Sequence, residues 1–164
     1  MAFSFTTLRS EHAAVWRALK LEGVRDFPLG FLHSEAETLA TPIDGAKDIL
    51  NHGAMRGVFD GETLIGFCGY RPLLPERIRH RAEIGPFFVT AAYHGKGAAQ
   101  VLINGVIQEA VAAGIEYLEL FVDTENDPAI RFYERQGFER TAMHPDGVRI
   151  DGVSRSDYFY RLRL

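Results

Sequence analysis

The segment Val89-Thr90-Ala91-Ala92-Tyr93-His94-Gly95-Lys96-Gly97-Ala98-Ala99 decides the fold of this chain. A strand-like run ends within it, a few residues turn, and a helix then begins on small residues. The first N–H groups of a helix lack intrahelical partners, and the helix dipole adds positive potential there. An anion can approach those groups only where side chains leave room. The segment therefore predicts a phosphate-binding turn, with a tight strand–helix turn packed through small residues as the alternative.

Two better-known phosphate loops do not fit this segment. A Walker loop requires Gly-x-x-x-x-Gly-Lys followed by Ser or Thr, but Gly97 follows Lys96 and the first glycine is missing. A dinucleotide-binding fingerprint requires Gly-x-Gly-x-x-Gly after a first strand, but Gln100 stands where the third glycine belongs. The residues expected to hold an anion here are His94, Gly95, Lys96, Gly97, Ala98 and Ala99.

The chain after the turn alternates between helical and strand patterns. The apolar residues expected along one face of the first helix are Val101, Leu102, Val106, Ala110 and Ala113. Glycine is the natural residue just after a helix, and proline is favoured at its first position. The expected elements are a helix that begins after Lys96 and is closed by Gly114, a strand at Ile115–Asp123, a helix from Pro128 to Gln136 closed by Gly137, and two strands around Asp146-Gly147 and Asp151-Gly152.

The chain before the turn is expected to contain a helix-bearing N-terminal part and a hairpin. The first helix is predicted from Glu11 to Gly23, with Ser10 as its N-cap. Its buried side is expected to carry Val15, Trp16, Ala18 and Leu19. The other elements are a strand at Phe3–Thr6, helical pieces at Ser34–Leu39 and Gly45–Asn51, a hairpin of Arg56–Phe59 and Thr63–Tyr70 turning at Asp60-Gly61, and a strand at Glu83–Thr90. Together these predict one α/β domain over residues 1–164 with a mixed sheet.

Composition excludes several classes of protein. The chain is 46% hydrophobic and 24% charged, as expected for a globular domain. No apolar run approaches the ~20 residues of a membrane span. The net charge of −4 argues against a general nucleic-acid binder, and the basic stretch Arg77–Arg81 is expected to be a solvated loop or strand end. Cys68 is the only cysteine, and Met1–Thr6 lacks the pattern of a secretory signal, so we expect a cytoplasmic protein.

At this point the sequence resembles the GNAT superfamily of N-acyltransferases. The pyrophosphate motif of that family, Gln/Arg-x-x-Gly-x-Gly/Ala, is matched at Gly97 and Ala99, while His94 departs from it. Its closing motif, Asn-x-x-Ala-x-x-x-Tyr-x-x-x-Gly-Phe, is matched at every named position by Asn126–Phe138. The resemblance covers about residues 56–138, and the region before it is similar only in layout.

The resemblance implies a mostly antiparallel mixed sheet, flanked by helices and splayed into a V-shaped cleft for acetyl-CoA. Gly85-Pro86 would be the bulge that splays the cofactor strand from the next strand, since proline within a strand indicates an edge or a bulge. The backbone of Phe87, Phe88 and Val89 would meet the pantetheine arm and thioester. Asn126 would cap its helix or contact that arm, with Asp127 as a competing cap. The acceptor would be an amine on a protein or small molecule, and a homodimer is compatible with the family.

Acyl transfer to an amine requires a base and an acid, because a primary amine with pKa near 10 is mostly protonated at pH 7. Glu83 is the candidate general base, with pairing to Arg79 or Arg81 as the alternative. Alternation places Glu83, Gly85, Phe87 and Val89 on one face of the strand. Tyr133 is the candidate general acid, with a core tyrosine as the alternative. The carbonyl is expected to be polarised by the N–H of Phe88 or Val89.

Other chemistries are not supported by the sequence. The six histidines show no metal-ligand spacing, so no metal is expected. Cys68 is expected in the core, and no Gly-x-Ser-x-Gly elbow is present. Phe27–Glu37 is expected to be either an acceptor-pocket lining or a packed surface loop. The sequence therefore predicts an N-acetyltransferase, with a non-catalytic acyl-CoA-binding module on the same fold as the alternative.

Overall fold

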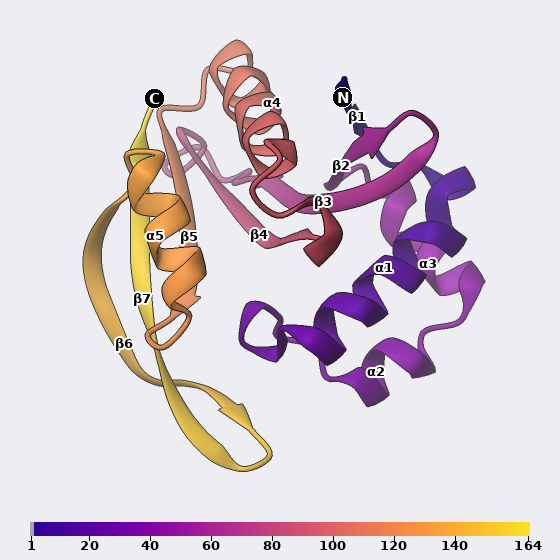
Figure 1. The fold of residues 1–164 in the computed structure, drawn as a ribbon. Helices are drawn as coiled ribbons and strands as arrows, with labels where there is room; N and C mark the ends of the chain where they lie inside the picture. The colour runs from indigo at the N-terminus through magenta and orange to yellow at the C-terminus, as the bar shows by residue number, and fades with distance from the viewer. Residues whose placement is uncertain (1) are drawn as a thin grey trace.

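The computed structural model describes residues 2–164 as a seven-stranded sheet with helices on both faces (Figure 1). The strands are β1 (Phe3–Thr7), β2 (Met55–Asp60), β3 (Thr63–Pro72), β4 (Arg81–Val89), β5 (Tyr117–Asp123), β6 (Glu139–Ile150) and β7 (Val153–Arg163). The helices are α1 (Ala13–Asp26), α2 (Glu35–Ala40), α3 (Ile43–Asn51), α4 (Ala98–Ala112) and α5 (Asp127–Arg135), with short 3₁₀ turns at Ser10–His12, Pro28–Gly30 and Ala91–Tyr93.

The sheet order is β1-β2-β3-β4-β5-β7-β6. All neighbouring pairs are antiparallel except β4 and β5, which run parallel. A parallel pair needs a long crossover, and α4 supplies it. The predicted mixed, mostly antiparallel sheet is confirmed.

The centre of the sheet splits where β4 leaves β5. Strand β4 pairs with β5 only over Arg81–Glu83, and the two strands diverge beyond that point, which opens the V seen in Figure 1. On the other side of β4, Cys68 lies opposite Phe87 and Tyr70 opposite Ile84, so Gly85 and Pro86 form a bulge facing Gly69. The predicted bulge is confirmed.

The bulge overturns the predicted strand alternation. One extra residue moves every later side chain to the other face of the sheet. Glu83 therefore faces the side opposite α4, whereas Phe87 and Val89 pack in the core that α4 covers, and Phe88 packs in the core beneath α1. The expectation that Glu83, Phe87 and Val89 share a face was wrong.

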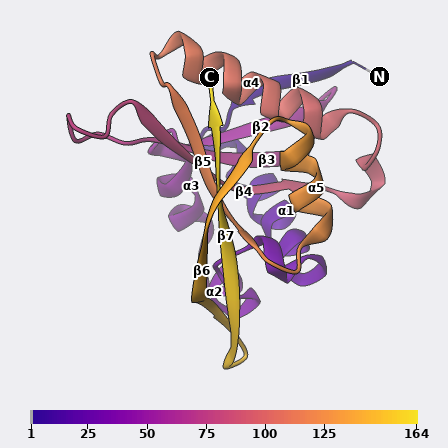
Figure 2. The same cartoon turned by 90° about the vertical axis from the view of Figure 1, so that its left-hand side faces the viewer.

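Two hydrophobic cores cover the two faces of the sheet. Helix α4 packs across β1–β4, and its core continues to α5 through Leu118 and Tyr160 (Figure 2). A Cβ at Gly105 of α4 would collide with the ring of Phe5, so glycine lets this helix approach β1 closely. On the opposite face, α1 and α3 bury Trp16 against Phe67.

Most predicted elements are present, with local corrections. Helix α1 begins after a 3₁₀ turn, so its N-cap is His12 and not Ser10. Val15, Ala18 and Ala113 are exposed, because the buried stripes of α1 and α4 are narrower than the apolar pattern. The C-terminal hairpin turns at Asp151-Gly152, while Asp146-Gly147 lies in an irregular part of β6.

The predicted hairpin, the glycines that close α4 and α5, and the core cysteine are confirmed, whereas α1 continues to Asp26, past its predicted end at Gly23. Strands β2 and β3 pair around the turn after Asp60, and both Gly114 and Gly137 adopt positive φ just beyond a helix. Cys68 is fully buried, and burial raises the pKa of its thiol to about 12. None of the helices that the structure describes combines the length and apolar character needed to span a bilayer.

Candidate active site

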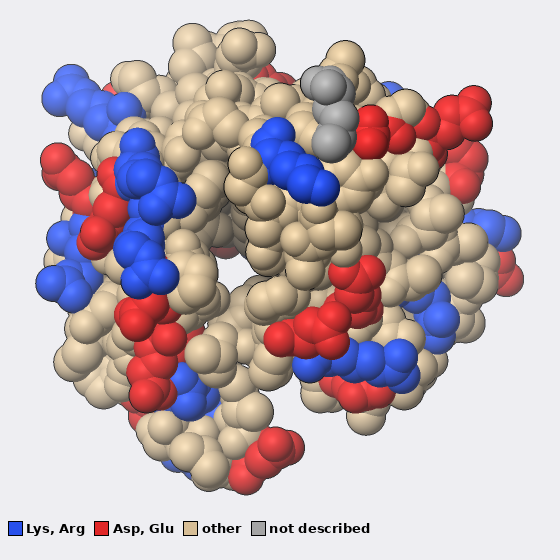
Figure 3. All heavy atoms as spheres, in the orientation of Figure 1, with Lys and Arg blue, Asp and Glu red and all other residues tan. Residues whose placement is uncertain are grey.

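A cavity of about 540 Å³ occupies the gap between β4 and β5. Its walls come from both faces of the sheet, because the diverging strands leave an opening through the molecule, visible at the centre of Figure 3. On the α5 side it is lined by Asn126, Ala129 and Tyr133. On the other side it is lined by the loop Leu29–His33 and by side chains of β5, β6 and β7.

The open edge of β4 presents backbone polar groups to this gap. Phe88 pairs with Phe67 of β3, and the Thr90 N–H donates to the Ile65 carbonyl at 2.9 Å. Since successive residues of a strand point their backbone groups to opposite edges, Phe87 and Val89 direct theirs towards the cleft. The geometry favours Val89 over Phe88 as the N–H donor.

His94 closes part of this edge. Its Nε2 lies 2.7 Å from the Val89 carbonyl oxygen, and its ring packs against Phe27. His94 thus fixes the exit of β4 into the turn, while the Val89 N–H is directed towards the cleft. This role was not predicted, since the sequence analysis placed His94 among the residues expected to hold an anion and noted its departure from the motif.

The turn before α4 leaves its helix N-terminus accessible. Gly95 and Gly97 have φ of 71° and 92°, a region that favours glycine, and a Cβ at either would meet no atom within 4 Å. Gly97 is the N-cap and no side chain caps the helix, whose first turn contains no acidic residue. Lys96 is exposed beside it, over the ring of Tyr93. This arrangement suits a phosphate group.

Helix α5 brings Asn126 and Tyr133 to the same cavity. Asn126 is the N-cap, accepting a hydrogen bond from the Ala129 N–H at 3.4 Å, so Asp127 is not the cap. Tyr133 is only 8% exposed, and its ring contacts those of Phe87 and Phe138. Burial raises the pKa of the Tyr133 phenol well above its ordinary value, so the hydroxyl keeps its proton at neutral pH.

Glu83 lines the cavity from β4 and is half exposed. The cation nearest to it in an ion pair is Arg71 of β3, at 3.9 Å, because Arg81 pairs with Glu119 instead. Arg71 also donates to the Gly85 carbonyl at 2.8 Å and so steadies the bulge. A long, exposed ion pair contributes little stability, and Glu83 stays accessible to a ligand.

Glu119 joins β4, β5 and β7 at the point where the V closes. It is 2% exposed, and Arg81 donates to both of its oxygens at 2.7 and 2.8 Å. Arg161 Nε approaches the same carboxylate at 3.1 Å as an ion pair without hydrogen-bond geometry. A buried carboxylate requires such partners, and the two arginines balance the negative charge of Glu119.

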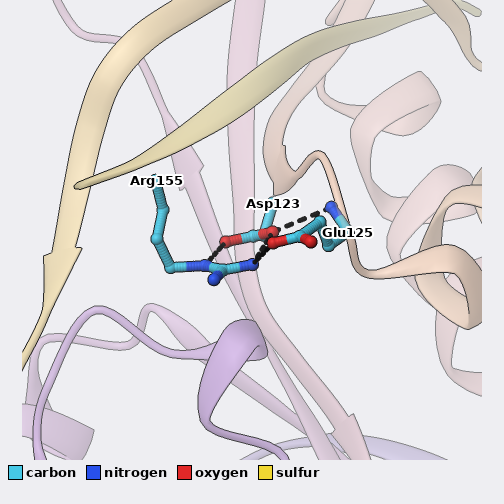
Figure 4. Close-up of polar contacts among 3 residues, drawn as sticks. All are labelled: Asp123, Glu125 and Arg155. Carbon is cyan, nitrogen blue, oxygen red and sulfur yellow. Dashed lines mark hydrogen bonds and ion pairs between the residues drawn. The ribbon is translucent and has the colours of Figure 1, made fainter. Parts of the chain in front are cut away.

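The negative charge of Asp123, at the end of β5, is also balanced by an arginine (Figure 4). Arg155 donates to its two oxygens at 2.5 and 2.8 Å and to Glu125 at 2.5 Å. Burial alone would raise the pKa of Asp123, but the hydrogen bonds from Arg155 and from the Glu125 N–H hold it below its ordinary value.

Asp157 of β7 is a cavity residue that sequence reasoning missed. It lies directly opposite Asp123 and is 7% exposed, yet within residues 2–164 its carboxylate has no hydrogen-bond or ion-pair partner. Burial raises its pKa, the charge of Asp123 adds to this, and His144 opposes it. The only signal in the sequence is its place in an alternating strand, which does not reveal its neighbours.

Comparison with known proteins agrees with this geometry. The sequence model described as the Acetyltransferase (GNAT) family matches residues 16–138. The chain belongs to the GNAT acetyltransferase family. The match covers the sheet from β2 to β5 and all the candidate residues named from the sequence.

Two curated relatives illustrate the membership, and one solved structure shares the fold. The chain is 31% identical to the mycothiol acetyltransferase of Brachybacterium faecium over 79% of its own length and 38% of that protein. It is 31% identical to the N-alpha-acetyltransferase RimI of Mycobacterium tuberculosis over 62% of each chain. The structure of yncA from Salmonella typhimurium with its cofactor acetyl-CoA superposes with a TM-score of 0.84 at 17% identity, covering 100% of this chain and 95% of that one.

The residues of this GNAT chain fit acetyl-CoA. The unpaired edge of β4 offers Phe87 and Val89 backbone groups to an amide-bearing arm, and that edge leads directly into the open turn at Gly95–Ala99, where helix N–H groups suit a pyrophosphate. Within residues 2–164, no three His, Cys, Asp or Glu side chains are grouped so as to hold a metal ion.

Proposed function

We propose that this protein is an acetyl-CoA-dependent N-acetyltransferase in which a primary amine attacks the thioester directly. The observation that carries the proposal is the continuous path along β4, where the strand loses its partner after Glu83, presents its backbone at Phe87 and Val89, and runs into an uncapped helix N-terminus at Gly97. The cavity that flanks this path opens to both faces of the sheet, so donor and acceptor can enter from opposite sides.

The cofactor residues act through position and backbone. His94–Ala99 would hold the pyrophosphate, with helix N–H groups as donors and Lys96 as a nearby cation. The Phe87 backbone would bond the pantetheine arm as an added strand, and the Val89 N–H would polarise the acetyl carbonyl, since the Val89 carbonyl already contacts His94. Phe88 would contribute through packing, and Asn126 would border the arm from α5 while capping its helix.

Glu83 would act as the general base, directly or through water. Acetyl-CoA, when bound, supplies the activated acetyl group, and transfer replaces its C–S bond with an amide C–N bond. The attacking amine must lose a proton. Glu83 is a half-exposed carboxylate that lines the cavity on the side opposite α4, where it can receive this proton. Arg71 lies beside Glu83 as a nearby cation, while its own hydrogen bond goes to the Gly85 carbonyl.

Tyr133 would act as the general acid towards the departing sulfur. Its hydroxyl carries a proton at neutral pH because burial raises its pKa. A thiolate has an ordinary pKa near 8.5, so a phenol O–H of higher pKa stabilises it by donating a hydrogen bond as the proton is shared. Tyr133 lines the cavity on the α5 side, opposite the loop Leu29–His33, which supports this role.

The rest of the proposal concerns the whole chain. Residues 1–164 would form a single catalytic domain that works in the cytoplasm on an amine of a small molecule or a protein, without binding nucleic acid or membrane. A homodimer is compatible with this, and sedimentation velocity would measure it. The acidic net charge and the single buried cysteine support this part of the proposal.

Thermal unfolding with and without acetyl-CoA tests the proposal first, with ATP as the control ligand. A ligand at 100 times its dissociation constant adds about 2.7 kcal/mol of stability, which raises the midpoint by roughly 5–10 °C for a domain of this size. A shift with acetyl-CoA alone is expected. Release of the CoA thiol in the presence of amines then tests turnover. Binding without turnover of any amine would identify a non-catalytic acyl-CoA-binding module, and no shift with any acyl-CoA would contradict the proposal.

A further inference from the structure

The carboxylates around the cavity are compensated unequally. Glu119 is held by Arg81 and Arg161, Asp123 by Arg155, and Glu83 is half exposed beside Arg71. Asp157 alone among them is more than nine-tenths buried without a cationic partner in residues 2–164. A buried carboxylate without a partner is costly, so a cation that came from a ligand would find an unmatched site there.

The surroundings of Asp157 leave its carboxylate facing the cavity. Figure 4 shows that the Arg155 guanidinium, the cation nearest in the strand, is directed at Asp123 and Glu125. From β6, His144 and Gly147 pack against Asp157, and a Cβ at Gly147 would lie 2.5 Å from the Asp157 carboxylate. The irregular part of β6 thus bends around this group and makes room for it, while both β6 and β7 line the cavity.

Asp157 is too far from β4 to act on the reacting nitrogen. Strand β5 stands between β4 and β7, and two strand spacings amount to about 10 Å even without divergence. The strands do diverge at this level, since β4 and β5 pair only up to Glu83 and Glu119. The group that Asp157 can meet therefore lies at the far end of the acceptor from the attacking amine.

Part of the cavity wall between the two ends is apolar. The rings of Phe121 and Phe159 lie side by side on β5 and β7 with centroids 5.0 Å apart, one row from Asp123 and Asp157. The loop residues Leu29, Phe31 and Leu32 line the cavity from the opposite side. Such walls suit a hydrocarbon spacer.

From this arrangement we propose that Asp157 binds a second, non-reacting ammonium group of the acceptor, so that the preferred substrate is a diamine or polyamine with an apolar spacer. This inference rests on the proposed function for the identity of the reacting end. It adds a specificity-determining residue on β7 and a substrate class. The reacting amine lies by Glu83 near the closed end of the V, the spacer runs over Phe121 and Phe159, and the distal charge meets Asp157.

Calorimetric titration of α,ω-diamines tests the proposal. The series runs from putrescine to octamethylenediamine, and each member is compared with the amino alcohol of the same length, which keeps one amine and replaces the other with a neutral hydroxyl. Titrations are made with the free protein and with the protein saturated with coenzyme A, which has no acetyl group to transfer. The wild-type protein is expected to bind the best diamine about tenfold or more tightly than its amino alcohol.

The variant Asp157→Asn removes the charge and keeps the shape. It is expected to lower diamine affinity by about tenfold or more and to leave amino-alcohol affinity unchanged within about twofold. Asp48→Asn, an exposed carboxylate on α3, is the matched control and should change neither. Equal affinity for diamine and amino alcohol in the wild-type protein, or an undiminished preference in Asp157→Asn, would overturn the inference.

Failure of this inference is distinguishable from failure of the proposed function. Acetyl-CoA is titrated into the same preparations. If acetyl-CoA binds and the diamine preference is absent, the inference alone is wrong. If acetyl-CoA does not bind, the proposed function is wrong, and the diamine titrations of the free protein still decide whether Asp157 holds a cation.

Discussion

The two walls of the cavity hold their polar groups in opposite ways. Along β4 and the start of α4 the polar groups belong to the backbone. They are open because β4 diverges from β5 and because no side chain caps the N-terminus of α4. Along β5 and β7 they are buried side chains, and most of them are matched by arginines. The first wall can receive any ligand with the right shape and charge pattern, whereas the second can discriminate between ligands.

The largest expected effect concerns the backbone wall. Gly97→Glu places bulk and negative charge at the helix N-terminus where the pyrophosphate is proposed to lie. We expect acetyl-CoA affinity to fall about 1,000-fold or more, equivalent to about 4 kcal/mol, as measured by calorimetry.

Gly53→Glu is the matched control for this change. Gly53 also has a positive φ, of 72°, and free space for a Cβ, but it lies in the turn before β2. It reproduces the backbone strain and the added charge without touching the turn at Gly97. Retained tight binding in Gly97→Glu, or an equal loss in both variants, would remove the pyrophosphate assignment.

The next effect concerns the point where the two walls meet. Glu119→Gln leaves Arg81 and Arg161 facing a neutral amide in a site where the carboxylate is 2% exposed. Breaking a buried ion pair in this way is expected to cost about 3 kcal/mol of unfolding free energy, measured by urea denaturation. Glu116→Gln, just before β5 and exposed, should change it by less than about 0.5 kcal/mol. A negligible loss of unfolding free energy in Glu119→Gln would show that packing alone holds β4 and β5 together at the closed end of the V.

A third effect separates chemistry from packing on α5. Tyr133→Phe keeps the ring that contacts Phe87 and Phe138 and removes only the hydroxyl. We expect kcat to fall about 100-fold, with acetyl-CoA affinity and the unfolding midpoint nearly unchanged. Tyr117→Phe, which lies outside the cavity lining, is the control. Parallel losses of stability and activity would assign Tyr133 to the core instead.

The contrast between the walls also explains what the sequence could predict. A backbone site needs small residues, and Gly95, Gly97, Ala98 and Ala99 show that need directly in the sequence, as Asn126 and Gly137 show the limits of α5. The bulge was visible at Gly85-Pro86. Its consequence was not, because the reversal of alternation after Gly85 depends on how β4 pairs with β3.

The wall along β5 and β7 depends on pairings between residues that are distant in the sequence. Arg155 pairs with Asp123, which is 32 positions away in the sequence, and Arg81 pairs with Glu119, which is 38 positions away. Local patterns do not encode such partners, so Asp157 was not distinguishable from other strand carboxylates. The region before β2 had the same difficulty, since the loop Leu29–His33 becomes a cavity wall through contacts of its segment with the distant strands β4 and β5.

The smallest effect tests whether the lack of an ion-pair partner for Asp157 lowers the stability of the protein. Its pKa is raised in the folded protein above its ordinary value, first by burial and then by Asp123. The folded state therefore binds its proton more tightly than the unfolded state, and stability is lost as pH rises from the unfolded pKa, near 3.9, through the folded pKa. Asp157→Asn removes this loss, so the variant should be more stable than the wild type at pH 7.

The gain should shrink as the pH is lowered towards 4, because the wild-type carboxyl then becomes neutral as well. Denaturation curves of both proteins between pH 4.5 and 7.5 measure this, and His144, Asp123 and Arg155 are common to both. A gain that does not depend on pH would place the cause in packing rather than charge. A more stable protein that no longer prefers a diamine would show that the unmatched carboxylate is kept for binding at the expense of stability, whereas a destabilised variant would show that Asp157 already has a partner.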